Sequence, residues 1–491
     1  MRKHEDSTRV KKAKTQKRVD QSSHKMATLK CRANHTKKRE FPLNLLIHDA
    51  TIITCKKRII RNGAIAIEDK EIVEIGKSSI LKAKYRRGYE RINGKGKVVI
   101  PGLINTHQHA AMSLLRGYAD DLPLQEWLEK WIWPIEKHMT PHDIYVGALL
   151  TAIESIMSGT TTVNTMYHYS PEENEAKAFS EVGLRGVVGH VCFSWRKKQD
   201  QKALNALAKT WHNKADGTIR ASVDPHSAYT IDPRYMKELH EKKQELNKRY
   251  GSEKSPIISH IHVAETEDET SKIRNAFDVH VKGGVMEYLD SLRVLDKHVI
   301  AAHCVALTEK DIKVAKQRHV KVSHNPVSNL KLASGVSPIP RMLKAGVTVS
   351  LGTDSPCSNN TADMFSVMKT TALLHKGINK NPTLMPAEQV LKLATIEGAK
   401  ALSWENEIGS IEKGKKADLA IVNFNKPHLH PVYDEISHLV YAAKASDVET
   451  VIINGRMIME NRKLTTLNVH KVVKMVEEAK ENLLNKLRHQ R

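Results

Sequence analysis

The sequence is poor in cysteine and in aromatic residues. The cysteines are odd in number, scattered, and form no CxxC pair: Cys31, Cys55, Cys192, Cys304 and Cys357. This distribution argues against a disulfide framework and against a zinc site built on cysteines, and a reducing cytoplasm fits it best. Aromatic residues make up only 5% of the chain, which disfavours the base-stacking platforms of a protein that binds single-stranded nucleic acid.

Long apolar runs are also missing. No run approaches the roughly 18–20 residues that a membrane span needs, and the basic N-terminus has no apolar core of a secretory signal. We therefore expect neither a membrane protein nor a secreted one. The 40% hydrophobic and 27% charged residues are ordinary for a folded protein. A length of 491 residues suits one large domain with an appendage, or two to three small domains.

Acidic residues are too few to balance the basic ones: 55 Asp and Glu stand against 78 Lys and Arg, a formal net charge of +23. Residues 1–40 alone hold 14 Lys and Arg against 4 Asp and Glu, a net +10. Because this segment has almost no apolar periodicity, we expect a disordered basic extension. Three interpretations of this extension remain. It is a tail that contacts nucleic acid or an acidic partner, it is a solvated extension without a partner, or it is absent because translation starts at Met26.

From residue 41 onward the pattern becomes that of a folded protein. Residues 45–54, 63–67 and 72–75 indicate antiparallel strands. Residues 98–105, VVIPGLIN, form a nearly continuous apolar run that is typical of a strand buried on both faces. Helices and strands then alternate to about residue 400, with helices opening at Thr140-Pro141 and Ser170-Pro171 and ending at Gly159 and Gly183.

Counting from VVIPGLIN gives eight strands, the later ones at residues 161–166, 187–191, 219–223, 257–263, 299–302, 320–323 and 347–351. Eight βα units over roughly 300 residues predict an α/β fold with a (β/α)8 TIM-type barrel. A doubly wound open sheet is the alternative, but no GxGxxG follows the first strand.

Further strands at residues 417–422 and 448–453 lie more than 300 residues after the first ones. The simplest packing pairs them with the N-terminal strands in a small composite β-sandwich into which the barrel is inserted. The predicted organisation is a basic extension (1–40), a composite sandwich (41–100 and 405–465), a catalytic barrel (101–404) and a C-terminal helix with one apolar face (466–491).

Histidines and carboxylates lie at or just after the ends of five predicted barrel strands: His107, His109, His260, His262, Glu265, His303, His324 and Asp354. Residues i and i+2 of an extended segment point the same way, and barrel enzymes build their sites at the C-terminal ends of the strands. Each histidine alone is more often structural, as we expect for the pair His428 and His430 outside the barrel. Together they predict a metal centre.

Imidazole nitrogens and carboxylate oxygens suit Zn²⁺, with Fe²⁺ or Mn²⁺ as alternatives. Such a metal lowers the pKa of its bound water towards about 7. Glu265 is placed to move protons between that water and a leaving group.

Five segments resemble the signature segments of the amidohydrolase superfamily: PGLINTHQHAAMSLLRG, HVAETEDE, AAHC, VSHNPVSNLKLASG and LGTDSPCSNN. They are similar to the branch of 5-methylthioadenosine/S-adenosylhomocysteine deaminases and 5'-deoxyadenosine deaminases. The resemblance covers about residues 42–460, and GSIEKGKKADLAIV resembles the return strand of the family's β-sandwich.

The resemblance implies one metal ion per subunit, held by His107, His109, His262 and Asp354. It implies that Asp354 also takes a proton from the water. No lysine ends the fourth strand, so a two-metal site built on a carboxylated lysine is not expected.

The resemblance further implies that Glu265 protonates the purine N1 and helps to deliver hydroxide to C6. His303 would orient the water. The implied product is the inosine analogue plus ammonia.

Substrate contacts implied by the resemblance are Trp127, Glu136, His226, Glu265 and Ser358. Trp127 would pack on the ligand, Glu136 would accept hydrogen bonds from the ribose hydroxyls, and His226 would contact the purine or the ribose. Ser358 would line the same end of the pocket. Without the resemblance, the tryptophan reads equally well as helix packing, Glu136 as a solvated charge and His226 as structural.

One stretch departs from the family pattern. Members that accept S-adenosylhomocysteine tend to place arginines near the third strand, whereas this chain reads GVVGHVCFSWRKKQD there, with His190 at one expected position and Arg196 as a poor substitute. This favours a small 5'-substituent, as in 5'-deoxyadenosine or 5'-methylthioadenosine.

The sequence thus predicts a cytoplasmic, homo-oligomeric, metal-dependent deaminase of adenosine-type nucleosides. The first alternative is another aminohydrolase or chlorohydrolase of the superfamily, of the guanine, cytosine or triazine type. The others are a nucleic-acid-binding protein, suggested by the charge, and an inactive scaffold, disfavoured because every expected ligand and Glu265 are present.

Overall fold

The computed structural model describes residues 44–56 and 59–488 of the chain. The predicted basic extension, residues 1–40, lies outside the described residues. Among the helices of the described part, none has the length and apolarity needed to cross a membrane.

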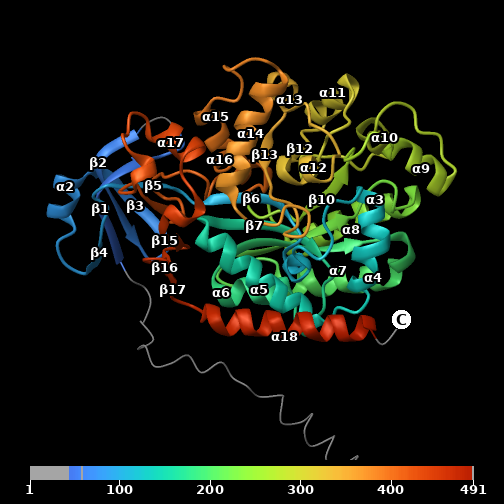
Figure 1. Ribbon diagram of the computed structural model, residues 1–491, viewed down its shortest axis with the longest axis horizontal. Coiled ribbons are helices and arrows are strands. Elements are labelled where there is room, and N and C mark those ends of the chain that lie inside the picture. Colours follow the sequence, from blue (N-terminus) through green and yellow to red (C-terminus); the bar gives the residue numbers. More distant parts are fainter. Residues whose placement is uncertain (1–43, 57–58, 489–491) are drawn as a thin grey trace, which may run out of the picture. The chain divides into compact units, whose positions relative to one another are not determined.

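Within the described residues, eight parallel strands follow one another in sequence order around a nearly closed barrel (Figure 1). The first and last strands meet through hydrogen bonds from Asp354 N to His107 O (2.9 Å) and from Thr106 Oγ1 to Leu351 O (2.9 Å). This arrangement confirms the predicted TIM-type barrel. The strands are β6 (Leu103–Gln108), β7 (Thr160–Tyr167), β8 (Arg185–Cys192), β9 (Ile219–Pro225), β10 (Ile258–Val263), β11 (Val299–His303), β12 (Lys321–His324) and β13 (Val349–Leu351).

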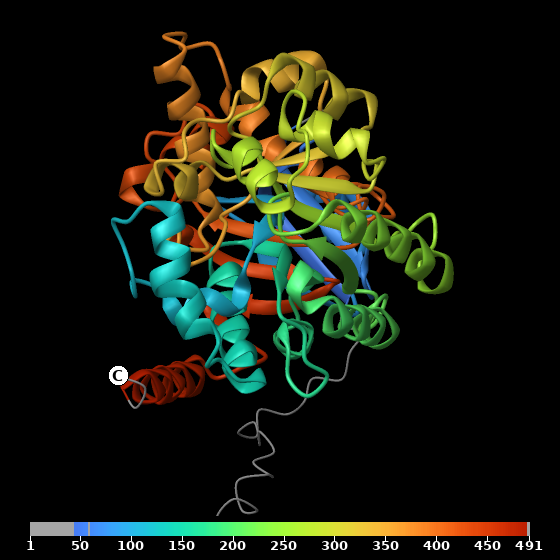
Figure 2. The same cartoon turned by 90° about the vertical axis from the view of Figure 1, so that its right-hand side faces the viewer.

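Helices surround these strands (Figure 2). Between β6 and β7 the chain forms η1 (Ala110–Leu115), α3 (Leu124–Glu126), the π-helical turn η2 (Trp127–Ile132), α4 (Trp133–Glu136) and α5 (Pro141–Met157). The later ones are α6 (Glu175–Val182), η3 (Ser194–Arg196), α7 (Lys197–Trp211), α8 (Pro233–Tyr250), α9 (Glu269–Phe277), α10 (Val285–Ser291), α11 (Glu309–Gln317), α12 (Pro326–Lys331), α13 (Ile339–Ala345), α14 (Met364–Ile378), α15 (Ala387–Leu393) and α16 (Ile396–Ala401).

Local capping decides where these helices start. Thr140 and Asp143 form the capping box of α5, as the predicted start at Thr140-Pro141 requires. The predicted start of α6 at Ser170-Pro171 is wrong, because Asn174 is the residue whose side chain accepts the cap hydrogen bond. Gly183 ends α6 in the left-handed region, with φ +88°, as predicted.

The run VVIPGLIN is two strands rather than one. Its first half belongs to β5 (Lys97–Pro101), and its second half begins β6, the first barrel strand. Between them, Pro101 has no N–H to donate, and the N–H of Gly102 donates to Asp418 O (2.8 Å). A Cβ on Gly102 would lie 2.1 Å from the Thr161 side chain. The chain therefore crosses from one sheet to the other at a point that only glycine fits.

The remaining strands of the described part form one nine-stranded mixed sheet, in which blue N-terminal and red C-terminal strands lie side by side (Figure 1). β14 pairs antiparallel with β5, with Ile421 opposite Val99. The predicted union of the two chain ends in one β-structure is confirmed. Its strands are β1 (Asn44–Ile53), β2 (Ile59–Glu68), β3 (Glu71–Lys77), β4 (Tyr89–Asn93), β5, β14 (Leu419–Asn423), β15 (Val448–Ile453), β16 (Arg456–Glu460) and β17 (Lys463–Leu464).

Five helical segments of the described residues lie outside the barrel. They are α2 (Ser78–Lys84), η4 (Pro427–Leu429), α17 (Glu435–Tyr441), η5 (Ala445–Asp447) and α18 (Val469–Arg488). α18 packs along α5 and buries Val472, Ala479 and Leu483, the apolar face expected from the sequence.

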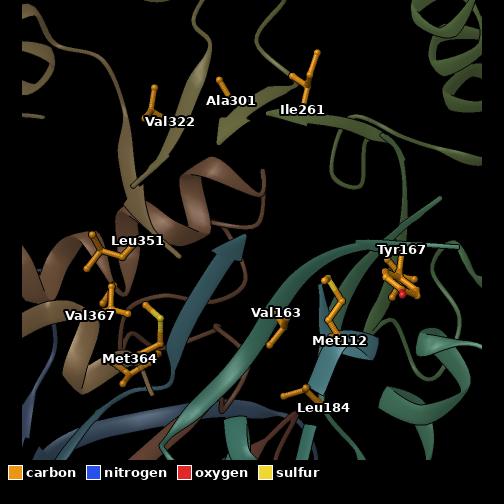
Figure 3. Close-up of a cluster of buried hydrophobic side chains, with 14 of the residues drawn as sticks. Met112, Val163, Tyr167, Leu184, Ile261, Ala301, Val322, Leu351, Met364 and Val367 are labelled. Carbon is orange, nitrogen blue, oxygen red and sulfur yellow. The ribbon is translucent and has the colours of Figure 1, made fainter. Parts of the chain in front are cut away.

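Alternate residues of the barrel strands point to two different environments. Val163, Ile261 and Val322 belong to the apolar layer that the strands share with residues such as Met364 and Val367 of α14 (Figure 3). The barrel interior has an apolar layer that includes Ile104, Ile258 and Ile300. Nearer the C-terminal ends of the strands it is polar and hydrogen-bonded: Thr106 Oγ1 lies 2.7 Å from Ser323 Oγ and 2.8 Å from Ser350 Oγ, and Asn164 Nδ2 lies 3.1 Å from His260 Nδ1. This polar interior lies directly behind the site described next.

Candidate active site and metal centre

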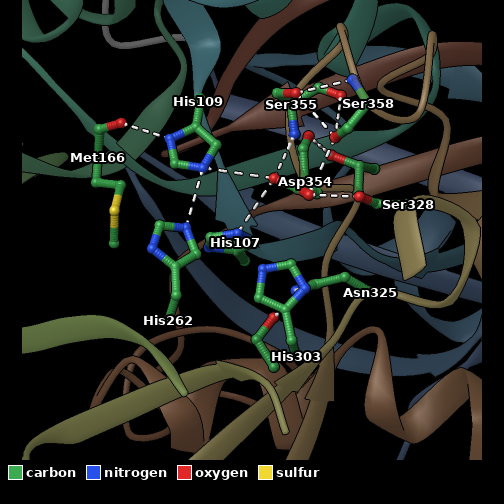
Figure 4. A network of polar contacts seen from close by, with 12 residues as sticks. His107, His109, Met166, His262, His303, Asn325, Ser328, Asp354, Ser355 and Ser358 are labelled. Carbon is green, nitrogen blue, oxygen red and sulfur yellow. Dashed lines mark hydrogen bonds and ion pairs between the residues drawn. The ribbon is translucent and has the colours of Figure 1, made fainter. Parts of the chain in front are cut away.

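Four side chains from three strands converge at the C-terminal mouth of the barrel (Figure 4). His107 lies on β6 and His109 just after it, His262 lies on β10, and Asp354 follows β13. The Nε2 atoms of His107 and His109 lie 3.2 and 3.4 Å from Asp354 Oδ1, and the Nε2 atoms of His109 and His262 lie 3.3 Å apart. The structure thus brings together all four residues that the sequence predicts as metal ligands.

Backbone carbonyls fix the tautomers of two of these histidines. His109 Nδ1 lies 2.9 Å from Met166 O, and His262 Nδ1 lies 2.6 Å from His226 O. Because a carbonyl only accepts, each Nδ1 carries a proton and each neutral ring presents a bare Nε2. Two lone pairs facing each other at 3.3 Å repel unless a cation lies between them. The donor set therefore fits a metal ion.

The surroundings hold each donor in its metal-binding form. Burial lowers the pKa of His107 to about 3 and also lowers those of His109 and His262, so the imidazoles are neutral. Burial alone would raise the pKa of Asp354, but its hydrogen bond with His107 and the nearby His303 and His109 hold it well below its usual value. Three neutral imidazoles and one carboxylate form a ligand set suited to a divalent cation.

Asp354 is further anchored by hydroxyl groups. Ser328 Oγ and Ser358 Oγ donate to Asp354 Oδ2 at 2.6 and 3.0 Å, and Ser355 N donates to Asp354 Oδ1 at 2.7 Å (Figure 4). Ser358, predicted to line the substrate pocket, does line it, but its hydroxyl supports the carboxylate. These contacts leave the Oδ1 edge facing the histidines.

Glu265 and His303 lie beside the ligand cluster. Glu265 Oε2 is 3.8 Å from His303 Nε2, and His303 Nδ1 donates to Asn329 Oδ1 (2.8 Å), so its bare Nε2 faces the glutamate. Burial raises the pKa of Glu265, while His303 opposes part of that shift. The glutamate thus retains a proton to higher pH than an exposed carboxyl group does, which suits a proton donor.

At the ends of three barrel strands, the backbone adopts an unfavourable conformation that directs the following side chains towards the site. Ala264, His303 and Asp354 have φ values of +49°, +70° and +63°, in the left-handed region that costs a non-glycine residue about 1 kcal/mol or more. Such conformations persist where the surrounding structure imposes them, and they cluster at functional sites.

A pocket opens in front of the cluster. Its lining includes every residue predicted to contact substrate: Trp127, Glu136, His226, Glu265 and Ser358. Trp127 Nε1 donates to Ala119 O (2.9 Å), which fixes its ring as a wall. Glu136 accepts a hydrogen bond from Tyr167 Oη (2.6 Å), and burial raises its pKa to about 7. His226 Nδ1 lies 3.1 Å from the hydroxyls of Ser227 and Thr230.

Other histidines at strand ends point elsewhere. His324 Nε2 lies 3.1 Å from His375 Nε2 of α14, and His260 Nε2 lies behind the ligand cluster, 2.8 Å from His107 Nδ1. His428 pairs with Asp447 Oδ2 (2.8 Å), in keeping with the structural role expected for it. The prediction that histidines at the ends of barrel strands lie in the site therefore fails for His324.

A second cavity lies beside the first, and of its lining only Glu136 and Arg196 were singled out from the sequence. This cavity, of about 630 Å³, is also lined by Arg196, and it shares five residues with the first pocket: Trp133, Glu136, Tyr167, His168 and Phe193. Arg196 Nη1 donates to His168 Nδ1 (2.8 Å). The available signal was position, because Tyr167 is the last residue of β7, His168 follows it, and residues 193–196 directly follow β8.

His190, in contrast, does not line either cavity. It is only 1% exposed. Its Nδ1 accepts from Tyr169 N (3.0 Å), so its Nε2 carries the proton that it donates to Asp200 Oδ1 (3.0 Å). Both ring nitrogens are thereby used inside the protein.

Comparisons with known proteins agree with this geometry. Residues 98–458 match the Amidohydrolase family. The chain is 44% identical over 450 residues to the 5-methylthioadenosine/S-adenosylhomocysteine deaminase of Thermoanaerobacter pseudethanolicus, covering 90% of this chain and 100% of the relative. It is 41% identical to the 5'-deoxyadenosine deaminase of Methanosarcina acetivorans, covering 90% and 98%.

Among solved structures, it is similar to an adenosine deaminase from Xanthomonas campestris with bound zinc. That similarity has a TM-score of 0.81 and 29% identity, and it covers 90% of this chain and 99% of the other.

Proposed function

The chain belongs to the amidohydrolase family, and on that premise we propose that it is a zinc-dependent deaminase converting adenosine-type nucleosides to inosine analogues and ammonia. The observation that carries the proposal is one pocket lined by three of the four predicted metal ligands, by the proton-holding Glu265 and by the partly buried Glu136.

The chemistry divides among residues already placed. A divalent metal held by His107, His109, His262 and Asp354 would supply Lewis acidity that lowers the pKa of a water molecule. Asp354 takes a proton from the attacking water. Glu265, which holds its proton by burial, gives that proton to the purine N1, so that C6 becomes the electron-poor centre.

Proton movement must also release ammonia. After donating its first proton, Glu265 is a carboxylate. It then takes up the proton of the hydroxyl group added to C6 and passes it to the departing amino group, while N1 keeps the first proton. His303, held by Asn329, presents Nε2 towards Glu265 and steadies the charge that develops during this exchange. Since the pocket also contains Trp127, Tyr167 and Phe193, bulk water is limited there and these charges interact more strongly.

Glu136 supports a nucleoside over a bare base. A carboxylate can accept hydrogen bonds from two vicinal hydroxyl groups at once. In the free protein, burial disfavours the ionised form of Glu136. Hydrogen bonds donated by a ribose would favour that ionised form. A bare guanine, cytosine or triazine has no diol for this carboxylate. The ribose recognition proposed here is therefore what separates this function from its rivals within the family.

The 5'-substituent would extend towards the second cavity, which begins at Glu136. His190, buried and hydrogen-bonded through both nitrogens, offers nothing to a tail carboxylate, so we place 5'-deoxyadenosine and 5'-methylthioadenosine first. The Arg196 side chain lines the cavity while bonded to His168, which leaves S-adenosylhomocysteine second. Values of kcat/KM for the three nucleosides decide the order, and a clear preference for S-adenosylhomocysteine would reverse it.

Zinc is our first choice of metal, with Fe²⁺ or Mn²⁺ as alternatives, and elemental analysis of the protein identifies the native ion. A homo-oligomer in the cytoplasm also remains part of the proposal. The described cysteines, Cys55, Cys192, Cys304 and Cys357, are buried and unpaired, which is compatible with a reducing compartment. Light scattering tests the oligomeric state.

The deciding experiment follows the absorbance shift from adenosine to inosine products, together with ammonia release, on a nucleoside panel. Zinc-loaded protein should be active and chelated protein inactive. Glu265→Gln should lower kcat by about 10³-fold, while the exposed Glu267→Gln, two residues away, serves as the matched control. Activity on guanine or triazines alone, or full activity in Glu265→Gln, would contradict the proposal.

A further inference from the structure

A histidine and an aspartate are buried behind the wall that the two cavities at the mouth of the barrel share. His190 belongs to β8, and Asp200 belongs to the first turn of α7. Their side chains are 1% and 0% exposed, and neither residue lines either of the two cavities. The chemical steps proposed above do not use them. Because burying such polar groups costs free energy unless they are hydrogen-bonded, their contacts indicate what they do.

The two side chains join the segments that follow two neighbouring strands. His190 Nδ1 accepts a hydrogen bond from Tyr169 N (3.0 Å), just after β7, and His190 Nε2 donates to Asp200 Oδ1 (3.0 Å). Asp200 Oδ2 accepts from Phe193 N (2.9 Å), just after β8. A continuous row of hydrogen bonds therefore connects the chain after β7 to the chain after β8, and both carboxyl oxygens of Asp200 are acceptors in it.

Cys192 lies beside this pair, so that a histidine, a cysteine and an aspartate offer donor atoms within 4.8 Å of one another. These donors are already engaged. Both ring nitrogens of His190 make the hydrogen bonds described above, and Cys192 Sγ donates to His190 O (3.5 Å). Burial raises the pKa of Cys192 well above its usual value, so the thiol keeps its proton. The cluster therefore fits a rigid support and not a metal site.

The pair holds the backbone of Phe193, whose side chain lines both cavities. The Phe193 ring stacks on His226, which lines the first pocket, with ring centroids 4.8 Å apart and an interplanar angle of 29°. It also stacks on Trp195, which lines the second cavity, at 4.6 Å and 27°. Three aromatic rings thus form a row from the first pocket into the second cavity, and Phe193 is the central member of that row.

Asp200 also holds the arginine of the same loop. Arg196 Nε lies 3.8 Å from Asp200 Oδ1, and Arg196 Nη1 donates to His168 Nδ1 (2.8 Å). The guanidinium group is thus engaged within the protein, beside the aromatic rings. An apolar group fits against this wall better than a hydroxyl group does, because the hydroxyl group would lose hydrogen bonds to water there.

We propose that His190 and Asp200 are positioning residues that set the selectivity of this protein for the group on C5' of the nucleoside. By fixing the backbone of Phe193 they fix the row of rings, and the rings favour an apolar 5'-substituent over a 5'-hydroxyl group. The inference rests on the proposed deaminase function and names the support of its substrate selectivity. Neither residue touches the substrate, and neither moves a proton in the reaction.

The network has only one arrangement of donors and acceptors. Because Tyr169 N and Phe193 N can only donate, His190 must accept at Nδ1 and donate at Nε2, and Asp200 must accept at both oxygens. An asparagine at position 200 offers one acceptor oxygen and one NH2 group, so one of the two donors would face another donor. Asp200→Asn therefore breaks the network while leaving the volume of the side chain almost unchanged.

Steady-state kinetics of the metal-loaded full chain on 5'-methylthioadenosine and adenosine test the proposal. The ratio of the two kcat/KM values does not depend on the fraction of active protein, so a variant that is merely less stable keeps the ratio of the wild type. We expect the wild type to prefer 5'-methylthioadenosine by about tenfold or more. Asp200→Asn should reduce that preference to about threefold or less. Its kcat on adenosine should change by less than about threefold, because the metal ligands and Glu265 belong to other strand ends.

Variants of His190 separate hydrogen bonding from packing. His190→Leu removes both ring nitrogens and should lose the preference. His190→Gln should retain it, because the amide can accept from Tyr169 N and donate to Asp200. If Asp200→Asn or His190→Leu does not fold, His190→Asn replaces it: the asparagine oxygen can still accept from Tyr169 N, but the side chain is too short to reach Asp200, so the preference should also fall.

The matched control is His212→Leu. His212 is 5% exposed and lines neither cavity. Like His190, it uses both ring nitrogens inside the protein: Nδ1 accepts from Ala221 N (3.1 Å), and Nε2 donates to Ser255 O (3.1 Å). His212→Leu should therefore lower the Tm as His190→Leu does and leave the preference unchanged.

Several results would overturn the inference and leave the proposed function intact. The wild type could deaminate both nucleosides without a preference, or Asp200→Asn and His190→Leu could keep the preference while their Tm falls, which would assign the pair to the fold alone. An equal loss of preference in His190→Gln and His190→Leu would assign the effect to packing, and an equal loss in His212→Leu would assign it to general destabilisation. A wild type that deaminates neither nucleoside would instead contradict the proposed function, and this inference with it.

Discussion

Strands β11 and β12 are neighbours in the barrel and each ends in a histidine, but only His303 reaches the active-site pocket. The register places Ala302 beside Ser323, so the two histidines occupy equivalent positions. His303 adopts φ +70° and turns its ring towards Glu265 and His262, while His324, outside the left-handed region, lies against His375 of α14.

The difference shows that the backbone turn after a strand, rather than the residue type, decides which side chain enters the mouth. The same left-handed turn occurs at Ala264, just before Glu265, and at Asp354. Each of these positions is stabilised from outside the turn: Asn329 holds His303, Glu269 holds the backbone of Glu265, and serines hold Asp354. Strain at the mouth is thus matched by hydrogen bonds from the following segments.

The largest contrast is expected between His303→Asn and His324→Asn. His303→Asn should lower kcat about 10²-fold, because the group beside Glu265 that steadies developing charge is lost. His324→Asn should change kcat by less than about threefold and instead lower the free energy of unfolding by about 1–3 kcal/mol. Steady-state kinetics and Tm measurements on both variants check this. Equal losses of kcat would mean that the two strand ends do not differ in function.

A second contrast lies on β10, where His260 and His262 are two residues apart. His262 is a predicted ligand, whereas His260 contacts His107 Nδ1 at 2.8 Å and would orient that ligand. We expect His260→Gln to weaken zinc binding about 10- to 100-fold and His375→Gln, the control, to leave it unchanged. Competition with a chromogenic chelator measures the affinity, and an unchanged affinity in His260→Gln would assign His260 to packing alone.

The smallest effect concerns the turn before Glu265. Glu269 Oε2 accepts from Glu265 N (3.0 Å). Glu269→Gln keeps an acceptor there and should retain kcat, while Glu269→Ala loses it and should lower kcat about tenfold with little change in KM. Measuring kcat and KM for Glu269→Gln and Glu269→Ala distinguishes a role in positioning Glu265 from a role of the negative charge. Equal kcat in both variants would show that Glu269 does not position Glu265.

The carboxyl group of Glu269 also makes the free energy of unfolding depend on pH. Burial raises its pKa from 4.5 to about 8, so between these values the folded protein holds a proton that the unfolded chain has released. The free energy of unfolding therefore falls as pH rises through this window. Glu269→Gln should remove that slope and be the more stable protein at pH 8. Denaturant titrations at pH 5 and pH 8 measure it, and an unchanged slope would contradict the assignment.

Much of the fold could be predicted because its signals are local. Apolar strands separated by capped helices are visible in the sequence, and eight such units predict the barrel. The errors arose where local signals were ambiguous. VVIPGLIN has the composition of one buried strand, and only the approach of Thr161 to Gly102 reveals the break. Ser170-Pro171 has the chemistry of a helix start, but Asn174 provides the cap.

The sequence by itself determined which strands are followed by a histidine or a carboxylate. It could do so because the length of a strand and the position of the next turn depend on residues close together in the chain. The tertiary structure decided which of those side chains meet. Met166 and His226 supply the carbonyls that set the tautomers of His109 and His262, and His375 draws His324 out of the site. Burial and partner choice depend on residues far apart in the chain, and local pattern does not encode them.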